Sequence, residues 1–234
     1  MAKFKRKADT EFDVDRPVVV CAKGPTFDVF PQFNFENYYT ASLTTTANLI
    51  KTPIDFLFFN DIEAFKQIKD KVFDNVANVV CPLVLHENEK PSKEYTSGYI
   101  KVALENKNLN IFTYRLKTQE SIFAIDHKEQ DATLLNDGNN HSVLDTAIAW
   151  FISLGFYKFI LVGVSDESEY AENFGKEKEE VFSEREPEWY QVNFMMTTSL
   201  LKKNSCKAVL VKDDKGGLLE MNCKANLKPT IEIV

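Results

Sequence analysis

The segment from residue 142 to residue 163 constrains the fold more than any other part of the chain. A helical pattern of apolar residues runs from about Val143 to Leu154, with Ser142 before it and Gly155 after it. Serine and glycine at these places are the expected caps of a helix. A β-type apolar run follows and ends at Gly163. A helix that leads directly into a buried strand is the repeating unit of α/β folds.

The rest of the chain repeats this alternation. Strand-like apolar runs lie at residues 17–22, 38–43, 54–59, 79–85, 110–116 and 208–211, and helical patterns lie from Ile62 to Val72 and at about 190–203. Short continuous apolar runs are typical of strands buried on both faces. The pattern predicts an α/β fold: a Rossmann-like, doubly wound, mostly parallel sheet with helices on both faces. Pro82, inside one run, indicates an edge strand or a strand broken at that residue.

The organisation predicted from the sequence is one domain after a tail. Residues 1–15 are charged and lack periodicity, so we expect a flexible tail there and a single Rossmann-like domain over 16–234. Residues 86–140 are mostly polar and predict an excursion over the sheet that carries ligand-facing loops. The acidic segment 166–188 is either a solvated surface segment or a lid over the site, because it leaves the end of a strand.

Charge and cysteine content exclude several functions. The formal net charge is −7, which disfavours nucleic acid as a partner, and the basic cluster near the start is interpreted as a solubilising tail. No stretch is apolar enough for a transmembrane segment. The four cysteines are widely spaced and lie mostly in or beside apolar runs, which favours buried free thiols in a reducing, cytoplasmic setting over disulfides or zinc. The oligomeric state is not predicted.

Candidate ligand contacts follow from where the strands end. In an open parallel sheet, ligands bind beyond the carboxyl ends of strands, near helix N-termini that attract anions. The residues at these places are Ala22, Lys23, Gly24, Pro25, Thr26, Thr44, Asn60, Asp61, Asn140, His141, Ser142, Ser165 and Asp166.

The turn Lys23–Thr26 is the first of these candidates. Gly24 allows a phosphate to approach the backbone, and Lys23 and Thr26 offer a charge and a hydroxyl. An ordinary tight turn also accounts for Gly24-Pro25. The sequence has neither the glycine fingerprint of dinucleotide-binding folds nor a P-loop.

Three other residues bear chemistry of their own. His141 at a helix N-terminus suits general-base work or ligand binding, and a structural cap is an equal alternative. Asp61 and Asp166 both follow strands and are either helix caps or oxygen ligands for a divalent cation. The histidines lack the spacing of a zinc site, so no bound metal is predicted from the residues themselves.

The ordered blocks Val19–Thr26, Phe58–Asp61 and Ser142–Gly163 resemble one group of Rossmann-like proteins across roughly residues 17–212. These are the motility-associated and MptE-like proteins, formerly a domain of unknown function, and the related bacterial family-42 sialyltransferases. In the group the first strand ends in a Gly-Asn-Gly-Pro-Ser type of turn. Here Gly24 and Pro25 are kept, while Lys23 replaces the asparagine and Thr26 the serine.

The resemblance implies roles for single residues. Asn60 matches a nucleotide-contacting asparagine of the sialyltransferases, and Asp61 is similar to an aspartate of the MptE-like proteins. Asp166 lies one position later than the acid of their Gly-x-Asp motif. Tyr170 resembles a tyrosine that holds the leaving phosphate. The sialyltransferases have a general-base histidine before the last helix, and none lies near Trp189-Tyr190.

Three functions remain open. The first is a transferase, a glycosyltransferase-like protein that binds a nucleotide or nucleotide-activated sugar, with His141 or Asp166 as the base and Tyr170 on the departing phosphate. The second, implied by the MptE-like resemblance, is a diphosphokinase that uses ATP and magnesium on a pterin-type alcohol, with Asp61 and Asp166 as metal ligands. The third is a catalytically degenerate member that binds a ligand. Donor and acceptor are not predicted.

Overall fold

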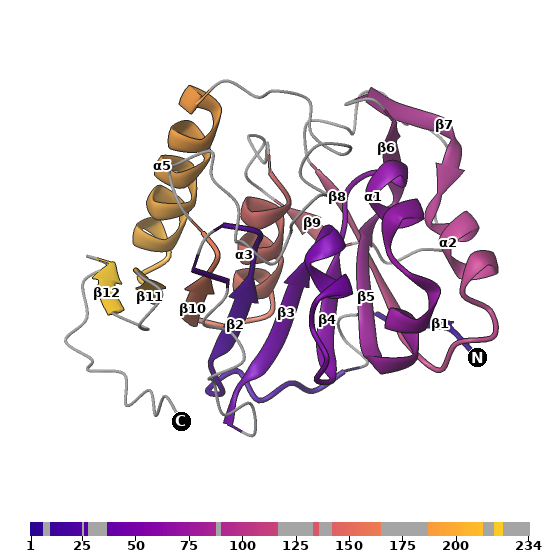
Figure 1. Cartoon of the computed structure of the whole chain (residues 1–234), viewed down its shortest axis with the longest axis horizontal. Helices are drawn as coiled ribbons and strands as arrows, with labels where there is room; N and C mark the ends of the chain where they lie inside the picture. The colour runs from indigo at the N-terminus through magenta and orange to yellow at the C-terminus, as the bar shows by residue number, and fades with distance from the viewer. Residues whose placement is uncertain are drawn as a thin grey trace. The chain divides into compact units, whose positions relative to one another are not determined.

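The computed structural model describes residues 1–6, 10–24, 26–27, 37–87, 90–116, 133–135, 142–164, 187–212 and 218–221. The chain forms two compact units, which are described in turn (Figure 1). The first unit consists of Met1–Asp13 and Ser42–Leu154, and the second of Val14–Ala41 and Gly155–Val234. Strand β3 (Tyr39–Leu43) therefore begins in the second unit and ends in the first.

The sheet of the first unit is parallel. Its strand order is β1 (Lys3–Phe4), β8 (Asn110–Leu116), β5 (Val76–Pro82) and β4 (Ile54–Phe58), and β9 (Thr133–Leu135) pairs with the end of β8. Residues near the carboxyl ends pair in register, with Phe58 opposite Val80 and Pro82 opposite Tyr114. The segments that follow β4, β5 and β8 therefore leave from the same edge. A separate antiparallel pair is formed by β6 (Val84–Glu87) and β7 (Lys90–Thr96).

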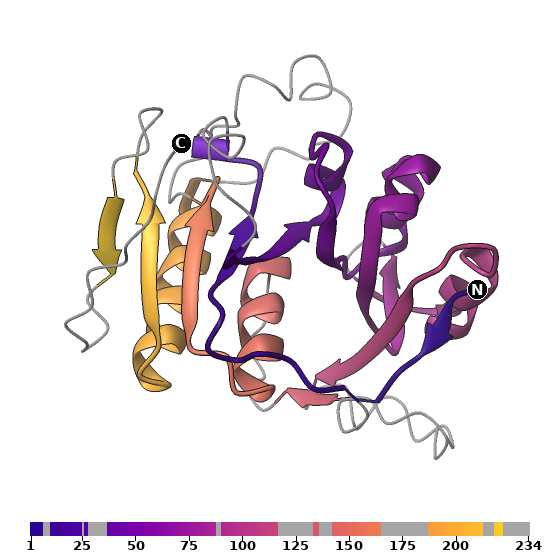
Figure 2. The same ribbon diagram turned by 90° about the horizontal axis from the view of Figure 1, so that it is seen from below.

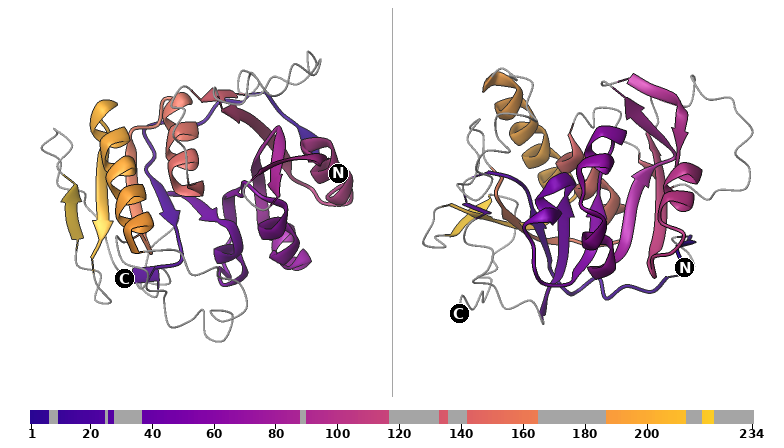
Figure 3. Two further views of the ribbon diagram at one scale, coloured as in Figure 1. Left: turned by 90° about the horizontal axis from the view of Figure 1, so that it is seen from above. Right: turned by 45° about the vertical axis from the view of Figure 1, so that its right-hand side comes forward.

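Different helices cover the two faces of β4. Successive strand residues point to opposite faces. Phe56 and Phe58 pack against Trp150 of α3 (Val143–Ser153), with ring centroids 5.7 and 5.6 Å apart. Phe59, just after the strand, packs against Phe65 of α1 (Ile62–Gln67) at 5.3 Å. Figure 3 shows α1 and α3 on the two sides of this part of the sheet. The phenylalanine-rich composition is thus used to bind helices to both faces.

The predicted helix over 62–72 is shorter in the structure. Helix α1 ends at Gln67, Ile68 and Lys69 are extended, and a short 3₁₀ helix, η5, covers Asp70–Asn75. The amide of Asn48 explains the break, because its Nδ2 donates to the Gln67 carbonyl at 3.0 Å and its Oδ1 accepts from the Lys69 N–H at 2.9 Å. A tertiary contact therefore satisfies backbone groups that a continuous helix would have paired.

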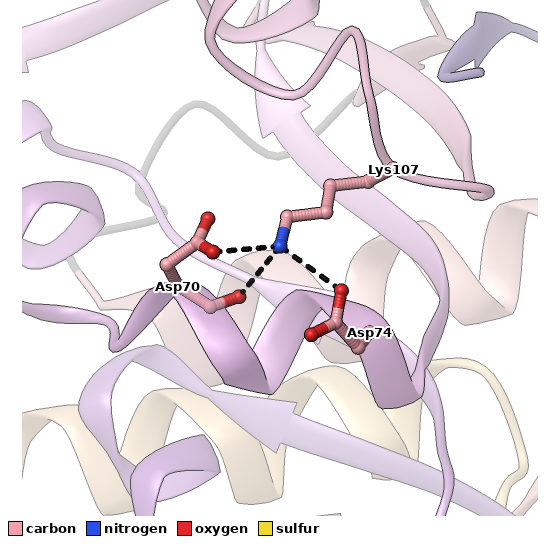
Figure 4. A network of polar contacts seen from close by, with 3 residues as sticks. All are labelled: Asp70, Asp74 and Lys107. Carbon is pink, nitrogen blue, oxygen red and sulfur yellow. Dashed lines mark hydrogen bonds and ion pairs between the residues drawn. The ribbon is translucent and has the colours of Figure 1, made fainter.

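A lysine fixes η5 in place (Figure 4). Lys107 Nζ donates to the carbonyl of Asp70 at 3.2 Å, to the carboxylate of Asp70 at 2.8 Å and to that of Asp74 at 3.0 Å. These hydrogen bonds raise the pKa of Lys107. The three ammonium protons of a lysine are matched by three acceptors here. Lys107 follows α2 (Ser97–Ala103), so the bonds attach that helical segment to η5.

Pro82 terminates a strand. The alternative of an edge strand is wrong, because β5 lies between β4 and β8. The alternative of a break at residue 82 is correct: β5 ends at Pro82, the N–H of Leu83 donates to the Tyr114 carbonyl at 2.8 Å, and β6 begins at Val84. The predicted excursion over residues 86–140 contains the predicted strand at 110–116, which is β8. It also contains regular structure that the polar sequence did not predict, namely the β6–β7 pair, α2 and β9.

The second unit has the strand order β3, β2 (Val18–Cys21), β10 (Lys158–Val162), β11 (Lys207–Val211) and β12 (Leu218–Met221). Strands β2, β10 and β11 are parallel, and β12 is antiparallel to β11. Helix α5 (Pro187–Lys203) lies behind β10 and β11 in the view of Figure 2. After β2 the chain continues to β3 on one side, and β10 lies on the other. The switch point of the topology is therefore between β2 and β10.

The predicted fold class is confirmed: the fold is α/β, with mostly parallel strands and helices packed on them. None of the helices in the described ranges is long and apolar enough to cross a membrane. The proposed lid at 166–188 falls almost wholly outside the described residues. The division into a tail and one domain stays a prediction, although Lys3 and Phe4 of the predicted tail form β1.

Candidate functional site

Two turns meet at the switch point of the second unit. The N–H of Gly24 donates to the Gly163 carbonyl at 2.7 Å, and the N–H of Ala22 donates to the Val162 carbonyl at 2.8 Å. The Thr26 hydroxyl accepts the Gly163 N–H at 2.8 Å. The turn predicted to bear the site is thus joined to Gly163, after β10, by two hydrogen bonds, and the third bond extends the pairing of β2 with β10.

Glycine is required on both sides of this contact. A Cβ on Gly24 would lie 2.6 Å from the Gly163 carbonyl oxygen, closer than real Cβ atoms approach. A Cβ on Gly163 would overlap the carbonyl of Ala22, and Gly163 has φ +67°, a left-handed conformation that disfavours other residues. Both glycines are buried, while Lys23 and Thr26 are half-buried beside them. The result is a tightly fixed backbone at the place where α/β sheets bind phosphate-bearing ligands.

A second polar group lies at the carboxyl edge of the first unit. Asn60 follows β4 and is half-buried, and its Oδ1 accepts a hydrogen bond from the Tyr114 hydroxyl at 2.5 Å. Its Nδ2 lies 3.5 Å from the Thr146 hydroxyl, which donates to the Ser142 carbonyl at 3.0 Å. This network, formed by Asn60, Tyr114 and Thr146, joins β4, β8 and α3. We call it the Asn60 network.

Burial controls the ionisation of groups around this network. Desolvation raises the pKa of the Tyr114 phenol well above its usual value; the nearby Cys81 and Asp61 act in the same direction, and a hydrogen bond with Thr146 acts against them. Burial also raises the pKa of the Cys81 thiol to about 12. In the second unit the Cys21 thiol, at the end of β2, has its pKa raised by burial too. These thiols stay protonated at neutral pH and are poor nucleophiles.

Ser142 and Asp61 each cap a helix. Ser142 accepts the Asp145 N–H at 3.1 Å and donates its own proton to the Asp145 carboxylate at 2.9 Å, so the predicted cap of α3 is confirmed. Asp61 accepts the Ala64 N–H at 2.5 Å at the start of α1. The backbone of Asp61 also forms an isolated parallel β-bridge with His86, and the backbone N–H of His86 donates to the Asn60 carbonyl at 3.0 Å. Their predicted contacts with a ligand remain predictions.

Thr44 is the remaining described candidate. It begins the short 3₁₀ helix η4 (Thr44–Asn48) and has φ +54°, which is unusual for a β-branched residue. Strained backbone of this kind is often retained at functional positions. The candidates outside the described residues are Pro25, Asn140, His141, Ser165, Asp166 and Tyr170. Within the described residues, no group of three or more His, Cys, Asp or Glu side chains could hold a metal ion.

Tyr114 and Thr146 were not predicted as site residues. Tyr114 stands in the apolar run of β8 and Thr146 in the first turns of α3, where the sequence pattern indicates an ordinary core residue and an ordinary helix residue. The one cue in the sequence is a hydroxyl group at a position expected to be buried. In the structure both side chains are nearly inaccessible, with 1% exposure for Tyr114 and 0% for Thr146. Buried hydroxyls require partners. Asn60 is their common partner, which only the fold reveals.

Comparisons with known proteins show distant structural likeness only. No family model matches the sequence, and no curated protein matches it. Among solved structures, the monofunctional α-2,3-sialyltransferase Cst-I from Campylobacter jejuni has a TM-score of 0.45 at 14% identity, covering 91% of this chain and 83% of that one. The sialyltransferase CstII from Campylobacter jejuni, in complex with the substrate analogue CMP-3FNeuAc, has a TM-score of 0.40 at 10% identity, covering 94% and 95%. These values are too low to transfer an activity to this chain.

Proposed function

We propose that this protein binds a nucleotide-activated sugar and acts as a glycosyltransferase-like transferase. The observation that carries the proposal is the paired glycine contact at the switch point, where Gly24 and Gly163 bring two strand-end turns together. Ligands of open α/β sheets bind at such points. The N–H groups of Ala22, Gly24 and Gly163 fix this contact, and Lys23 in the same turn offers a positive charge that suits a phosphate. The resemblance of the sequence blocks to sialyltransferases supports a sugar as the activated group.

Binding is tested by calorimetry. We expect the purified protein to bind at least one member of a panel of cytidine, uridine and guanosine monophosphates and their sugar conjugates. Thr26→Val removes the acceptor of the Gly163 N–H, which loosens the contact between the two turns, and it should therefore weaken this binding. Thr96→Val changes a threonine that makes no side-chain bond to its helix and serves as the control. The proposal fails if no nucleotide binds.

Turnover separates the transferase from a catalytically degenerate binding protein. The transferase should release free nucleotide from the sugar donor that it binds, and the release should respond to His141→Ala or Asp166→Asn, the two proposed bases. Binding without turnover of any donor supports the degenerate alternative. Both bases are proposed from the sequence alone, so the loss of nucleotide release is measured for each variant and assigned to that residue only.

The diphosphokinase alternative is tested through Asp61. It requires magnesium-dependent ATP turnover that Asp61→Asn abolishes. Asparagine is also a good N-cap, so this variant should preserve α1 while removing the carboxylate. If ATP turnover is absent, or persists undiminished in Asp61→Asn, Asp61 has no such role.

A further inference from the structure

The orientation of the Asn60 amide in the structure agrees with the protons available in the Asn60 network. The Thr146 hydroxyl has one proton and donates it to the Ser142 carbonyl at 3.0 Å. Toward Asn60, Thr146 therefore presents lone pairs, which agrees with the structure, where the NH₂ of Asn60 faces Thr146. Tyr114 and Thr146 also share a hydrogen-bonding contact, so the three side chains form one closed group. The amide oxygen is then left for Tyr114, whose hydroxyl donates to it at 2.5 Å.

Tyr114 is suited to act as a permanent donor. It is buried at the end of a central strand, opposite Pro82 in the neighbouring strand, so its ring cannot leave without disrupting the sheet. Burial raises the pKa of its phenol, which therefore keeps its proton over the working pH range. An amide held by a donor on one side and an acceptor on the other does not rotate to its flipped form, because both hydrogen bonds would be lost.

One hydrogen-bonding group of Asn60 remains. An asparagine NH₂ carries two protons, and Thr146 accounts for one. The second proton has no partner within the described part of the chain. Asn60 is half-buried at the carboxyl edge of its sheet, which is the edge where ligands of such sheets bind.

We propose that Tyr114 and Thr146 are positioning residues that fix Asn60 as a hydrogen-bond donor to the ligand. The ligand atom that meets Asn60 is therefore an acceptor, such as a carbonyl oxygen of a pyrimidine base or a hydroxyl oxygen of ribose. This inference rests on the proposed function for the identity of the ligand as a nucleotide. Beyond the proposed function, it states that Asn60 donates and the ligand accepts in this contact, and that Tyr114 and Thr146 hold Asn60 in that orientation.

The amide orientation is tested first without ligand. In protein labelled with ¹⁵N-asparagine, the Asn60 side-chain signals are identified by their loss in Asn60→Asp. Tyr114→Phe and Thr146→Val should each broaden or double these signals, because the amide gains access to its flipped form. Thr146→Ser keeps the hydroxyl and should restore the wild-type signals. Tyr157→Phe, which removes an equally short tyrosine bond to Asp15 elsewhere, should leave them unchanged.

The ligand contact is tested by titrating cytidine monophosphate into the same variants. We expect the Asn60 NH₂ signals to move on binding, Asn60→Asp to weaken affinity about tenfold, and Tyr114→Phe to weaken it about threefold. Thr146→Ser should bind as the wild type does. Unchanged Asn60 signals in Tyr114→Phe and Thr146→Val, or full affinity in Asn60→Asp, would overturn the inference. If the wild type binds no nucleotide at all, the proposed function fails, and the ligand-free spectra alone decide the orientation.

Discussion

Two separate features of the backbone require glycine at position 163. Its positive φ would strain any other residue, and an added Cβ would overlap the Ala22 carbonyl. Gly24 has only the second problem, with its Cβ 2.6 Å from the Gly163 oxygen. Backbone cannot give way as a flexible side chain can. The two glycines therefore belong to one contact, and the cost of substitution should differ between them.

We predict that Gly163→Ala destabilises the protein more than Gly24→Ala, by about 1 kcal/mol or more for the added strain at positive φ. Urea unfolding at neutral pH measures the difference. Gly98→Ala is the matched control, because Gly98 lies inside α2 and its added Cβ would meet only the Thr96 hydroxyl at 3.3 Å. That substitution should be neutral or slightly stabilising. Equal losses at 24 and 163 would show that the left-handed conformation of Gly163 is not maintained.

Only one of the two turns in this contact could be predicted from the sequence as part of a close backbone approach. A glycine directly after a buried strand indicates a close backbone approach, and this placed the site at residues 23–26. The partner at residue 163 also follows a strand, but sequence does not state which two strand ends are neighbours. That information comes from the pairing of β2 with β10. The Asn60 network was missed for the same reason, since Tyr114 is 54 residues from Asn60 in sequence.

Among the elements, α3 shows that a short sequence pattern can predict where a helix begins. Ser142 and Asp145 exchange two hydrogen bonds at its start, and the pattern Ser-x-x-Asp makes this predictable. We predict that Ser142→Ala lowers the free energy of unfolding by about 1 kcal/mol. Thr96→Ala is the control, because Thr96 precedes α2 without capping it through its side chain and should lose little. A loss at Thr96 as large as that at Ser142 would contradict this account.

Helix α1 shows that apolar periodicity does not predict where a helix ends. The spacing of Ile62, Phe65, Ile68 and Val72 is helical, and all four residues are buried, yet the helix ends at Gln67. Periodicity reports which side chains face the core, and it cannot detect that Asn48 supplies the hydrogen bonds at the end of the helix.

We therefore predict that Asn48→Ala destabilises the protein by roughly 1 to 2 kcal/mol, because the Gln67 carbonyl and the Lys69 N–H lose their shared partner. Asn48→Asp keeps the acceptor for Lys69 and should recover part of the loss. Thermal unfolding of the three proteins gives the order wild type, Asn48→Asp, Asn48→Ala. Hydrogen exchange should also show faster exchange of the Lys69 amide in Asn48→Ala. An unchanged midpoint would show that other contacts end the helix.

At the scale of the whole molecule, the buried ionisable groups determine its response to alkali. The Cys21 and Cys81 thiols and the Tyr114 phenol all have pKa values raised by burial, that of Cys81 from 9.0 to about 12. Each group is held protonated by the fold and ionises more easily once the chain unfolds. Above about pH 9 the unfolded chain therefore binds fewer protons than the folded one, so the free energy of unfolding must fall as the pH rises.

We predict that stability is insensitive to these groups below about pH 9 and then declines, by about 1.4 kcal/mol per pH unit for each group that titrates only in the unfolded chain. Urea unfolding at intervals between pH 8 and pH 11 measures the slope. Cys81→Val removes one such group, so its curve should start at a different height but fall less steeply by that amount. Tyr114→Phe should lower the slope only above about pH 10, where free tyrosine ionises. Parallel curves for all three proteins would show that these side chains already ionise in the folded state, and hence that the edge of the sheet beside Asn60 is open to water.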